Sequence, residues 1–109
     1  MDFGIAEIQS TFERGRVRYS DHTRDEMRDD EFGRIYDDDL YQALIAGEII
    51  EEYPNDKPLP SCLVFGRNLA GRPIHAVYGY NSEFERVVII TIYHPNPDLW
   101  IDYKKRRAK

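Results

Sequence analysis

Residues 62–94 read CLVFGRNLAGRPIHAVYGYNSEFERVVIITIYH, and this stretch decides the fold. It contains three runs rich in β-branched and aromatic residues, Cys62–Arg67, Arg72–Tyr80 and Arg86–His94. Runs of this composition are typical of β-strands, and the breaks between them, 68–71 and 81–85, have the length of hairpin connections. The stretch therefore predicts three successive strands joined as an antiparallel meander.

On the N-terminal side of the meander the pattern changes from strand to helix. Glu48–Tyr53 predicts one more short strand, which ends in the proline-rich turn 54–60. Apolar residues spaced three and four apart, together with hydroxyls and carboxylates suited to helix N-termini, predict three helices further upstream. We expect these helices over residues 3–14, from Ser20 or Asp21 to Met27, and from Asp37 to Gly47.

On the C-terminal side, the prolines of segment 95–97 end the meander, and residues 98–109 predict a short C-terminal helix that carries Trp100. Trp100 either covers the open edge of the core or stacks on a base. The basic tail 104–109 is either frayed and solvated or a contact for RNA phosphates. The chain therefore predicts a single α+β domain over residues 1–109, with N-terminal helices, an antiparallel meander of three to four strands and a short C-terminal helix.

Charge is distributed unevenly along the chain. The sequence has 15 basic and 20 acidic residues, for a net charge of −5. Between Asp25 and Asp56, twelve acidic residues face only two basic ones, Arg28 and Arg34, so the remainder carries an excess of basic residues. A net acidic protein is a poor nonspecific nucleic-acid binder, and we expect no DNA partner. The basic remainder could still supply a local anion site, unless the charges are simply spread over a solvated surface.

Several other classes of protein are excluded by simple features. Apolar runs such as Val87–Ile90 are far shorter than the ~20 residues that a membrane span needs, so we expect no membrane partner. No secretory signal is visible, and the single cysteine, Cys62, fits a reducing cytoplasm. Neither Cys62 nor any of the three histidines, His22, His75 and His94, lies at a metal-site spacing from another, so we expect no metal and no cofactor.

Four polar residues, Arg67, His75, Thr91 and Tyr93, lie within the predicted strands rather than in loops. Pairing the last two strands about their connection places His75 opposite Thr91, with Tyr93 diagonal to it on the same face. A five-residue connection in the preceding hairpin pairs Arg67 with Pro73 and puts Arg67 on the face of His75. A four-residue connection sends Arg67 to the other face.

An imidazole, a phenol and a guanidinium on one sheet face have a chemical use. Cleavage of RNA without metal needs a base for the 2′-hydroxyl proton, an acid for the leaving 5′-oxygen and fixed positive charge near phosphorus. Histidine can serve as base or acid near neutral pH, and arginine binds phosphate in bidentate fashion. The alternative reading is that the strand histidine is a hydrogen-bonded core residue and that Tyr93 only packs.

Five sequence segments, taken in order, carry a family resemblance. They are Arg18-Tyr19-Ser20-x-His22-x-x-x-x-Met27, Gly47-Glu48-Ile49-Ile50-Glu51, Leu63-Val64-x-Gly66-Arg67, Gly71-Arg72-Pro73-Ile74-His75 and Thr91-x-Tyr93-x-Pro95-x-Pro97-x-x-Trp100. The set covers roughly residues 17–107. It resembles an uncharacterised bacterial domain-of-unknown-function family that is similar to the RelE-like toxins of toxin–antitoxin modules.

The resemblance implies a RelE-toxin-like α+β fold and a metal-independent endoribonuclease acting on mRNA or at the ribosome. It also implies an antitoxin partner encoded nearby, sometimes one with a zinc-finger domain. Roles are then expected for eight residues: His22, His75, Arg67 and Tyr93 would be catalytic, and Arg24, Arg28, Arg72 and Thr91 would bind the substrate.

The sequence departs from the family pattern at two places on the predicted second helix. Thr23 stands where the family usually has alanine, and Glu26 stands where it usually has arginine. Arg24 and Arg28, four residues apart, could share a helix face and replace that arginine. If they do not, the alternative is a catalytically silent module that binds a partner protein.

Overall fold

The computed structural model describes residues 1–108 and contains three helices and seven strands. The helices are α1 (Ile5–Glu13), α2 (Asp21–Asp29) and α3 (Asp37–Ile45). The strands are β1 (Val17–Tyr19), β2 (Glu48–Tyr53), β3 (Ser61–Arg67), β4 (Pro73–Asn81), β5 (Arg86–Tyr93), β6 (Trp100–Ile101) and β7 (Lys105–Arg106). The fold is therefore α+β, as predicted.

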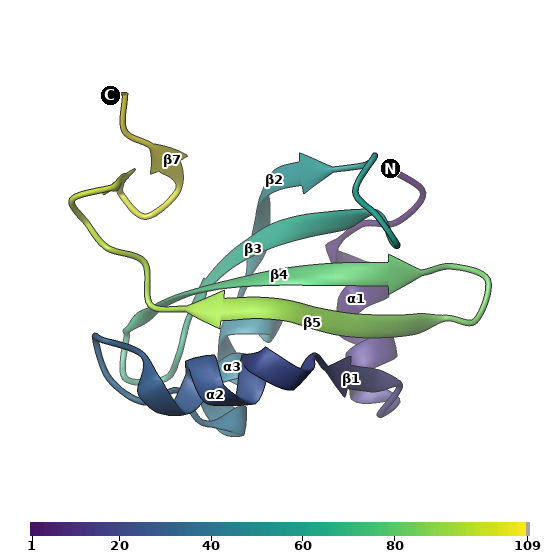
Figure 1. The fold of residues 1–109 in the computed structure, drawn as a ribbon, viewed down its shortest axis with the longest axis horizontal. Coiled ribbons are helices and arrows are strands. Elements are labelled where there is room, and N and C mark those ends of the chain that lie inside the picture. Colours follow the sequence, from purple (N-terminus) through teal and green to yellow (C-terminus); the bar gives the residue numbers. More distant parts are fainter. Residues whose placement is uncertain (109) are drawn as a thin grey trace.

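Five strands form one mostly antiparallel sheet in the order β1-β5-β4-β3-β2 (Figure 1). The predicted meander is confirmed, because β3, β4 and β5 pair consecutively and β2 pairs antiparallel with β3. Strand β1 was not predicted, since three residues carry no periodic signal. It pairs parallel with β5, and main-chain hydrogen bonds from Val87 to Arg16 and from Ser20 to Ile89 fix its two ends.

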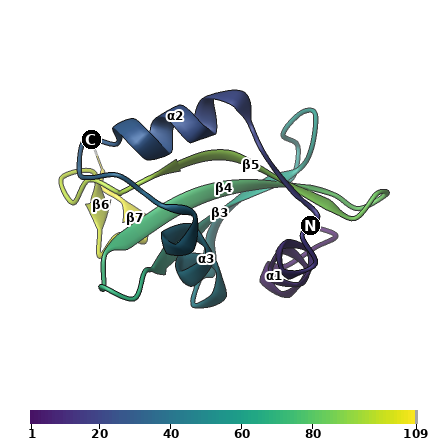
Figure 2. The ribbon, with the colours of Figure 1, turned by 90° about the horizontal axis from the view of Figure 1, so that it is seen from below.

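The two faces of the sheet have different coverings. Helices α1 and α3 lie on one face, and α2 lies on the other side, along β5 (Figure 2). Side chains that point toward α1 and α3 form the core, among them Ile74, Ala76, Tyr78 and Ile89. We call the opposite face, which carries Phe65, His75 and Tyr93, the open face. Helix α2 is attached to β5 by the hydroxyl of Thr23, which donates to the Ile89 carbonyl.

The register between β4 and β5 differs from the prediction. His75 lies opposite Tyr93, not opposite Thr91, and Thr91 lies opposite Val77. Two features each shift the pairing by one residue. The strands pair up to Asn81 and Arg86, which leaves a four-residue connection, and a β-bulge next to Val77 adds one residue to β5. His75, Thr91 and Tyr93 still share one face, because a total shift of two residues preserves the alternation of side chains.

The register between β3 and β4 resolves the placement of Arg67. Arg67 lies opposite Pro73, and Phe65 lies opposite His75. The five-residue connection is therefore the one present, and Arg67 is on the open face with His75.

The predicted C-terminal helix is wrong. The strands β6 and β7 pair antiparallel instead, and we call Trp100–Arg106 the C-terminal hairpin. Asp102 and Tyr103, in its turn, have positive φ angles of 52° and 61°, which a helix does not tolerate. Two contacts of Trp100 stabilise the hairpin in place of a helix. Trp100 packs edge-on against His75, at 4.5 Å between ring centroids, and Arg106 lies over the Trp100 ring at 4.6 Å.

No helix among residues 1–108 is long and apolar enough to cross a membrane.

Candidate functional site

His75, in the middle of the open face, is completely buried. Its Nε2 is 2.6 Å from the Tyr103 carbonyl oxygen, and its Nδ1 is 3.2 Å from the Tyr93 hydroxyl. A carbonyl can only accept, so Nε2 carries the hydrogen and Nδ1 accepts from Tyr93. Burial lowers the pKa of His75, although the hydrogen bond to Tyr103 opposes this. His75 is thus a neutral imidazole at neutral pH with both nitrogens occupied, and its Nδ1 accepts the hydrogen of the Tyr93 hydroxyl.

Tyr93 is the partly exposed end of this pair. Burial raises the pKa of its phenol, so the group is protonated at neutral pH. Because its hydrogen is directed to His75 Nδ1, the oxygen keeps a free lone pair for another donor. Thr91, two residues earlier on the same strand face, continues the polar surface toward α2.

Glu26 connects Thr91 to His22. The Thr91 hydroxyl lies 2.9 Å and 2.8 Å from the two carboxylate oxygens of Glu26. His22 Nε2 lies 3.9 Å from the same carboxylate, and the His22 side chain is 63% exposed. We call His22, Glu26, Thr91 and Tyr93 the α2–β5 strip. It brings together three of the predicted site residues and adds Glu26, whose position four residues after His22 on one helix was the available sequence signal.

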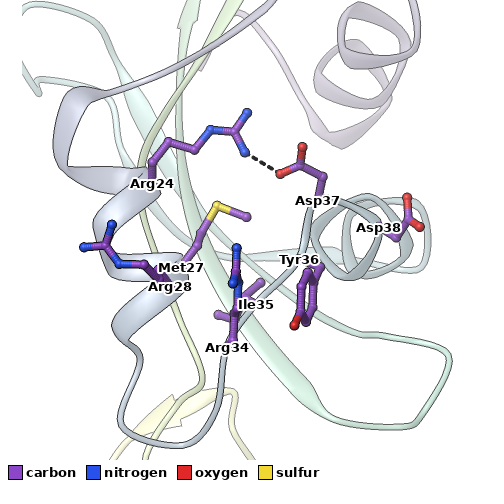
Figure 3. A pocket seen from close by; sticks show the side chains of 8 residues that line it. All are labelled: Arg24, Met27, Arg28, Arg34, Ile35, Tyr36, Asp37 and Asp38. Carbon is purple, nitrogen blue, oxygen red and sulfur yellow. Dashed lines mark hydrogen bonds and ion pairs between the residues drawn. The ribbon is translucent and has the colours of Figure 1, made fainter.

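Arg24 and Arg28 lie on the other side of α2, because helical residues two apart point in nearly opposite directions. Arg24 pairs with Asp37 at the start of α3 (Figure 3). Its guanidinium also lies 3.6 Å over the Tyr19 ring. Arg28 pairs with Asp25 and Asp29. The predicted phosphate-binding pair is therefore separate from the α2–β5 strip.

Arg24 and Arg28 line a cavity of about 370 Å³ between α2 and α3 (Figure 3). Its lining residues are Arg24, Met27, Arg28, Arg34, Ile35, Tyr36, Asp37 and Asp38. Met27 and Ile35 are buried and make it partly apolar. Arg34, which the sequence did not single out for a site, lies 4.9 Å over the exposed Tyr36 ring. We call this the arginine cavity.

Arg67 and Arg72, the two remaining predicted cations, hold the β3–β4 turn. Arg67 donates to the Gly71 carbonyl at 2.9 Å and lies near the rings of Phe65 and Tyr103. The Arg72 guanidinium donates to the Phe32 carbonyl. Neither arginine joins the α2–β5 strip.

A second cavity, of about 280 Å³, lies between the end of α2, the end of β5 and the C-terminal hairpin. Its lining residues are Asp30, Glu31, Tyr93, His94, Asn96, Leu99, Trp100 and Arg106. We call it the hairpin cavity. It shares Tyr93 with the α2–β5 strip, so the two form one polar region. Arg106 was missed as a site residue because a C-terminal helix was expected there.

Glu51 fixes Arg106 at this cavity. Arg106 Nε lies 2.8 Å from Glu51 Oε2, and the Tyr53 hydroxyl also donates to this carboxylate. Burial alone would raise the pKa of Glu51, but the hydrogen bonds from Arg106 and Tyr53 hold it below its usual value. Arg106 therefore stays charged and held in place.

Comparison with known proteins adds a family. Residues 19–94 match the family described as Domain of unknown function (DUF4258). The chain belongs to this family. The DUF4258 match includes the α2–β5 strip and the arginine cavity, whereas α1 and the C-terminal hairpin lie outside it. No curated protein and no solved structure matches the chain. Among residues 1–108, no group of three or more His, Cys, Asp or Glu side chains is placed to hold a metal ion.

Proposed function

We propose that this DUF4258 protein is a RelE-like toxin, a metal-independent endoribonuclease of a toxin–antitoxin module. One observation carries the proposal. Glu26 on α2 contacts both His22 on the same helix and Thr91 on β5. Strand β5 also carries Tyr93, whose hydroxyl is oriented by His75. An exposed imidazole paired with a carboxylate on α2, together with a protonated phenol on β5, would supply the base and the acid that RNA cleavage needs. The family resemblance of the sequence supports the same activity.

In the proposed reaction, His22 removes the 2′-hydroxyl proton while the Glu26 carboxylate stabilises the imidazolium that forms. The 2′-oxygen bonds to phosphorus, the bond from phosphorus to the 5′-oxygen breaks, and the Tyr93 hydroxyl turns from His75 Nδ1 to protonate the leaving oxygen. The products are a 2′,3′-cyclic phosphate and a 5′-hydroxyl. Arg106, which lines the same cavity as Tyr93, supplies fixed positive charge for the phosphorane.

The arginine cavity serves a different part of the RNA in this proposal. An RNA strand that crosses α2 brings a neighbouring phosphate to Arg24, Arg28 and Arg34, since guanidinium groups bind phosphate with two parallel hydrogen bonds. The natural inhibitor in the proposal is an antitoxin encoded nearby, and the substrate is cytoplasmic mRNA, free or on the ribosome.

The test in cells is expression of the wild-type chain in a bacterium, with and without the neighbouring open reading frame. We expect growth arrest and mRNA cleavage, both relieved by the neighbouring gene product. Normal growth with intact mRNA would refute the toxin proposal. The purified protein should cleave RNA in the presence of a chelator, with at least a tenfold loss in His22→Gln and Tyr93→Phe, from the usual contribution of one acid or base. Glu83→Gln, in the exposed β4–β5 connection, is the matched control and should keep full activity.

A second candidate, a silent module that binds a partner protein, is favoured by the ion pairs of its cations. Arg24 and Arg28 already pair with aspartates, and Arg106 pairs with Glu51. The variant Glu26→Arg, which restores the residue usual in the family, separates the two candidates. If Glu26 works with His22, this variant loses cleavage; if Glu26 silences the protein, the variant gains RNA binding. Absence of RNA binding by the wild type at low salt would favour the silent module.

A further inference from the structure

His94 lines the hairpin cavity and has a polar atom that the fold leaves without a partner. The residue is 6% exposed, and its Nε2 is the one buried side-chain nitrogen or oxygen in residues 1–108 that makes no hydrogen bond. Buried polar atoms in proteins are nearly always paired, so an unpaired one at a cavity indicates a place for a ligand atom.

The chemistry of that ligand atom follows from the other contacts of His94. Its Nδ1 lies 2.8 Å from the Pro73 carbonyl oxygen, which can only accept, so Nδ1 carries the hydrogen. In the neutral ring Nε2 then has a lone pair and accepts. The main-chain N–H of His94 donates to Asp30 at 3.1 Å, which fixes the residue in this orientation. The ligand must therefore offer an N–H or O–H group to Nε2.

The other lining groups add more acceptors and two aromatic rings. Asp30 and Glu31 contribute carboxylates, and Tyr93 contributes an oxygen whose hydrogen is already directed to His75. Of the two rings, Trp100 is 4% exposed and lies under Arg106, so the partly exposed Tyr93 ring is the one on which a planar group can stack. Arg106 contributes a guanidinium, which disfavours a cationic lysine or arginine side chain and instead suits a carbonyl oxygen.

We propose that the hairpin cavity binds a nucleobase that carries an amino group, and guanine best among them. Guanine presents adjacent N–H and NH₂ donors for the carboxylates and His94, together with a carbonyl oxygen for Arg106. The inference rests on the proposed function in taking RNA as the source of the base. The match between the donors of the base and the acceptors of the cavity is independent of cleavage.

Fluorescence of Trp100, the single tryptophan of the chain, reports binding directly. We expect quenching by guanosine monophosphate, with inosine monophosphate, which lacks only the 2-amino group, binding about tenfold more weakly because one hydrogen bond is lost. Uridine monophosphate is the control base without an amino group. Equal binding of the three nucleotides, or none, would overturn the proposal.

Two variants test the assignment. Glu31→Gln removes an exposed charge at the cavity, and His94→Phe keeps a ring but removes the acceptor. Each variant should bind guanosine monophosphate about tenfold more weakly than the wild type and should bind uridine monophosphate with unchanged affinity. Glu83→Gln should bind like the wild type. Quenching by a lysine-rich peptide but by no nucleotide would assign the cavity to a protein partner and refute the base site. Guanosine binding without RNA cleavage would refute the nuclease alone, and cleavage without base discrimination would refute the base site alone.

Discussion

At the residue scale, His75 is held by two hydrogen bonds and three aromatic rings. Phe65, Tyr93 and Trp100 each approach the imidazole edge-on, with centroids 4.5 to 5.9 Å away. Since the ring is neutral and dry, protonating it requires breaking the bond from Tyr93 or leaving a charge without solvent. Histidine contributes here to the structure of the open face and sets the direction of the Tyr93 hydroxyl.

The burial of His75 predicts that stability decreases at mildly acidic pH. Its pKa is lowered below the ordinary value of 6.5, by burial first and with Arg106 adding to it, while the Tyr103 carbonyl and Glu51 oppose the shift. Below about pH 6.5 the unfolded chain binds a proton that the folded chain does not, so the free energy of unfolding falls as pH falls toward the folded-state pKa. This stability is fully present above pH 6.5. Urea midpoints at pH 7.5 and 5.5 measure it, with a slope of at most about 1.4 kcal/mol per pH unit.

Two variants separate His75 from other groups in that measurement. His75→Phe should lower the free energy of unfolding by about 1–3 kcal/mol at pH 7.5, because Tyr93 and the Tyr103 carbonyl lose their partner, and should flatten the pH dependence. His22→Gln, on an exposed side chain, should keep both the stability and the slope. An unchanged slope in His75→Phe would assign the effect to another residue.

At the scale of elements, α2 has three sides with different surroundings. Thr23 and Met27 are buried against β5 and the core, His22 and Glu26 belong to the α2–β5 strip, and Arg24 belongs to the arginine cavity. The nine-residue helix α2 can present all three sides because it lies beside β5. Strand β1 pairs only with the first part of β5 and leaves the rest of that strand to α2.

The packing of α3 on β3 depends on the absence of a side chain at Gly66. A Cβ there would lie 1.8 Å from the main-chain oxygen of Ala43 on α3, so the helix would have to move. We expect Gly66→Ala to lower the free energy of unfolding by about 3 kcal/mol, measured by urea denaturation. Gly71→Ala is the comparison: its φ is +83° but it has open space, so only about 1 kcal/mol of backbone strain is expected. Equal losses in the two variants would show that α3 adapts to the added methyl group.

Arg106 attaches the C-terminal hairpin to Glu51 on β2. Removing the Arg106 guanidinium should therefore loosen the hairpin alone. In the Arg106–Glu51 pair Glu51 is 24% exposed and Arg106 is 62% exposed, so the pair is worth about 1 kcal/mol. Arg106→Gln should speed amide hydrogen exchange in Ile101–Lys105 while the amides of β4 stay protected. Lys104→Gln, which breaks the more exposed pair with Glu48, should change exchange less. Faster exchange throughout the sheet would instead mean that the hairpin supports the whole fold.

At the scale of the whole molecule, the net charge of −5 makes local cations decisive for any RNA affinity. Because most arginines of the proposed site are paired with carboxylates, only a few phosphates can be neutralised. We expect weak RNA binding with a small dependence on salt. Arg34→Ala should reduce the slope of log affinity against log salt by about 0.7, the value for one phosphate contact with a single strand. Arg86→Ala, outside the arginine cavity, should leave the slope unchanged. Identical slopes in all three proteins would exclude the arginine cavity as a phosphate site.

The local features of this fold could be predicted from the chain. The period-two pattern of residues 62–94 and its two short connections determine which strands exist and that they pair as neighbours, because both signals lie within a few consecutive residues. The same holds for the α+β class and for the clustering of His75, Thr91 and Tyr93 on one sheet face.

The site itself required contacts between distant residues. The bulge next to Val77, the hairpin built on Trp100, and the contact of Glu26 with Thr91 join residues up to 65 positions apart or depend on packing that no local window contains. Sequence by itself therefore determined the strands β2 to β5, their order in the meander and the residue types on the open face. Tertiary structure alone decided that His75 is sealed while His22 is exposed, because burial is a property of what packs against a residue and not of the residue's neighbours in the chain.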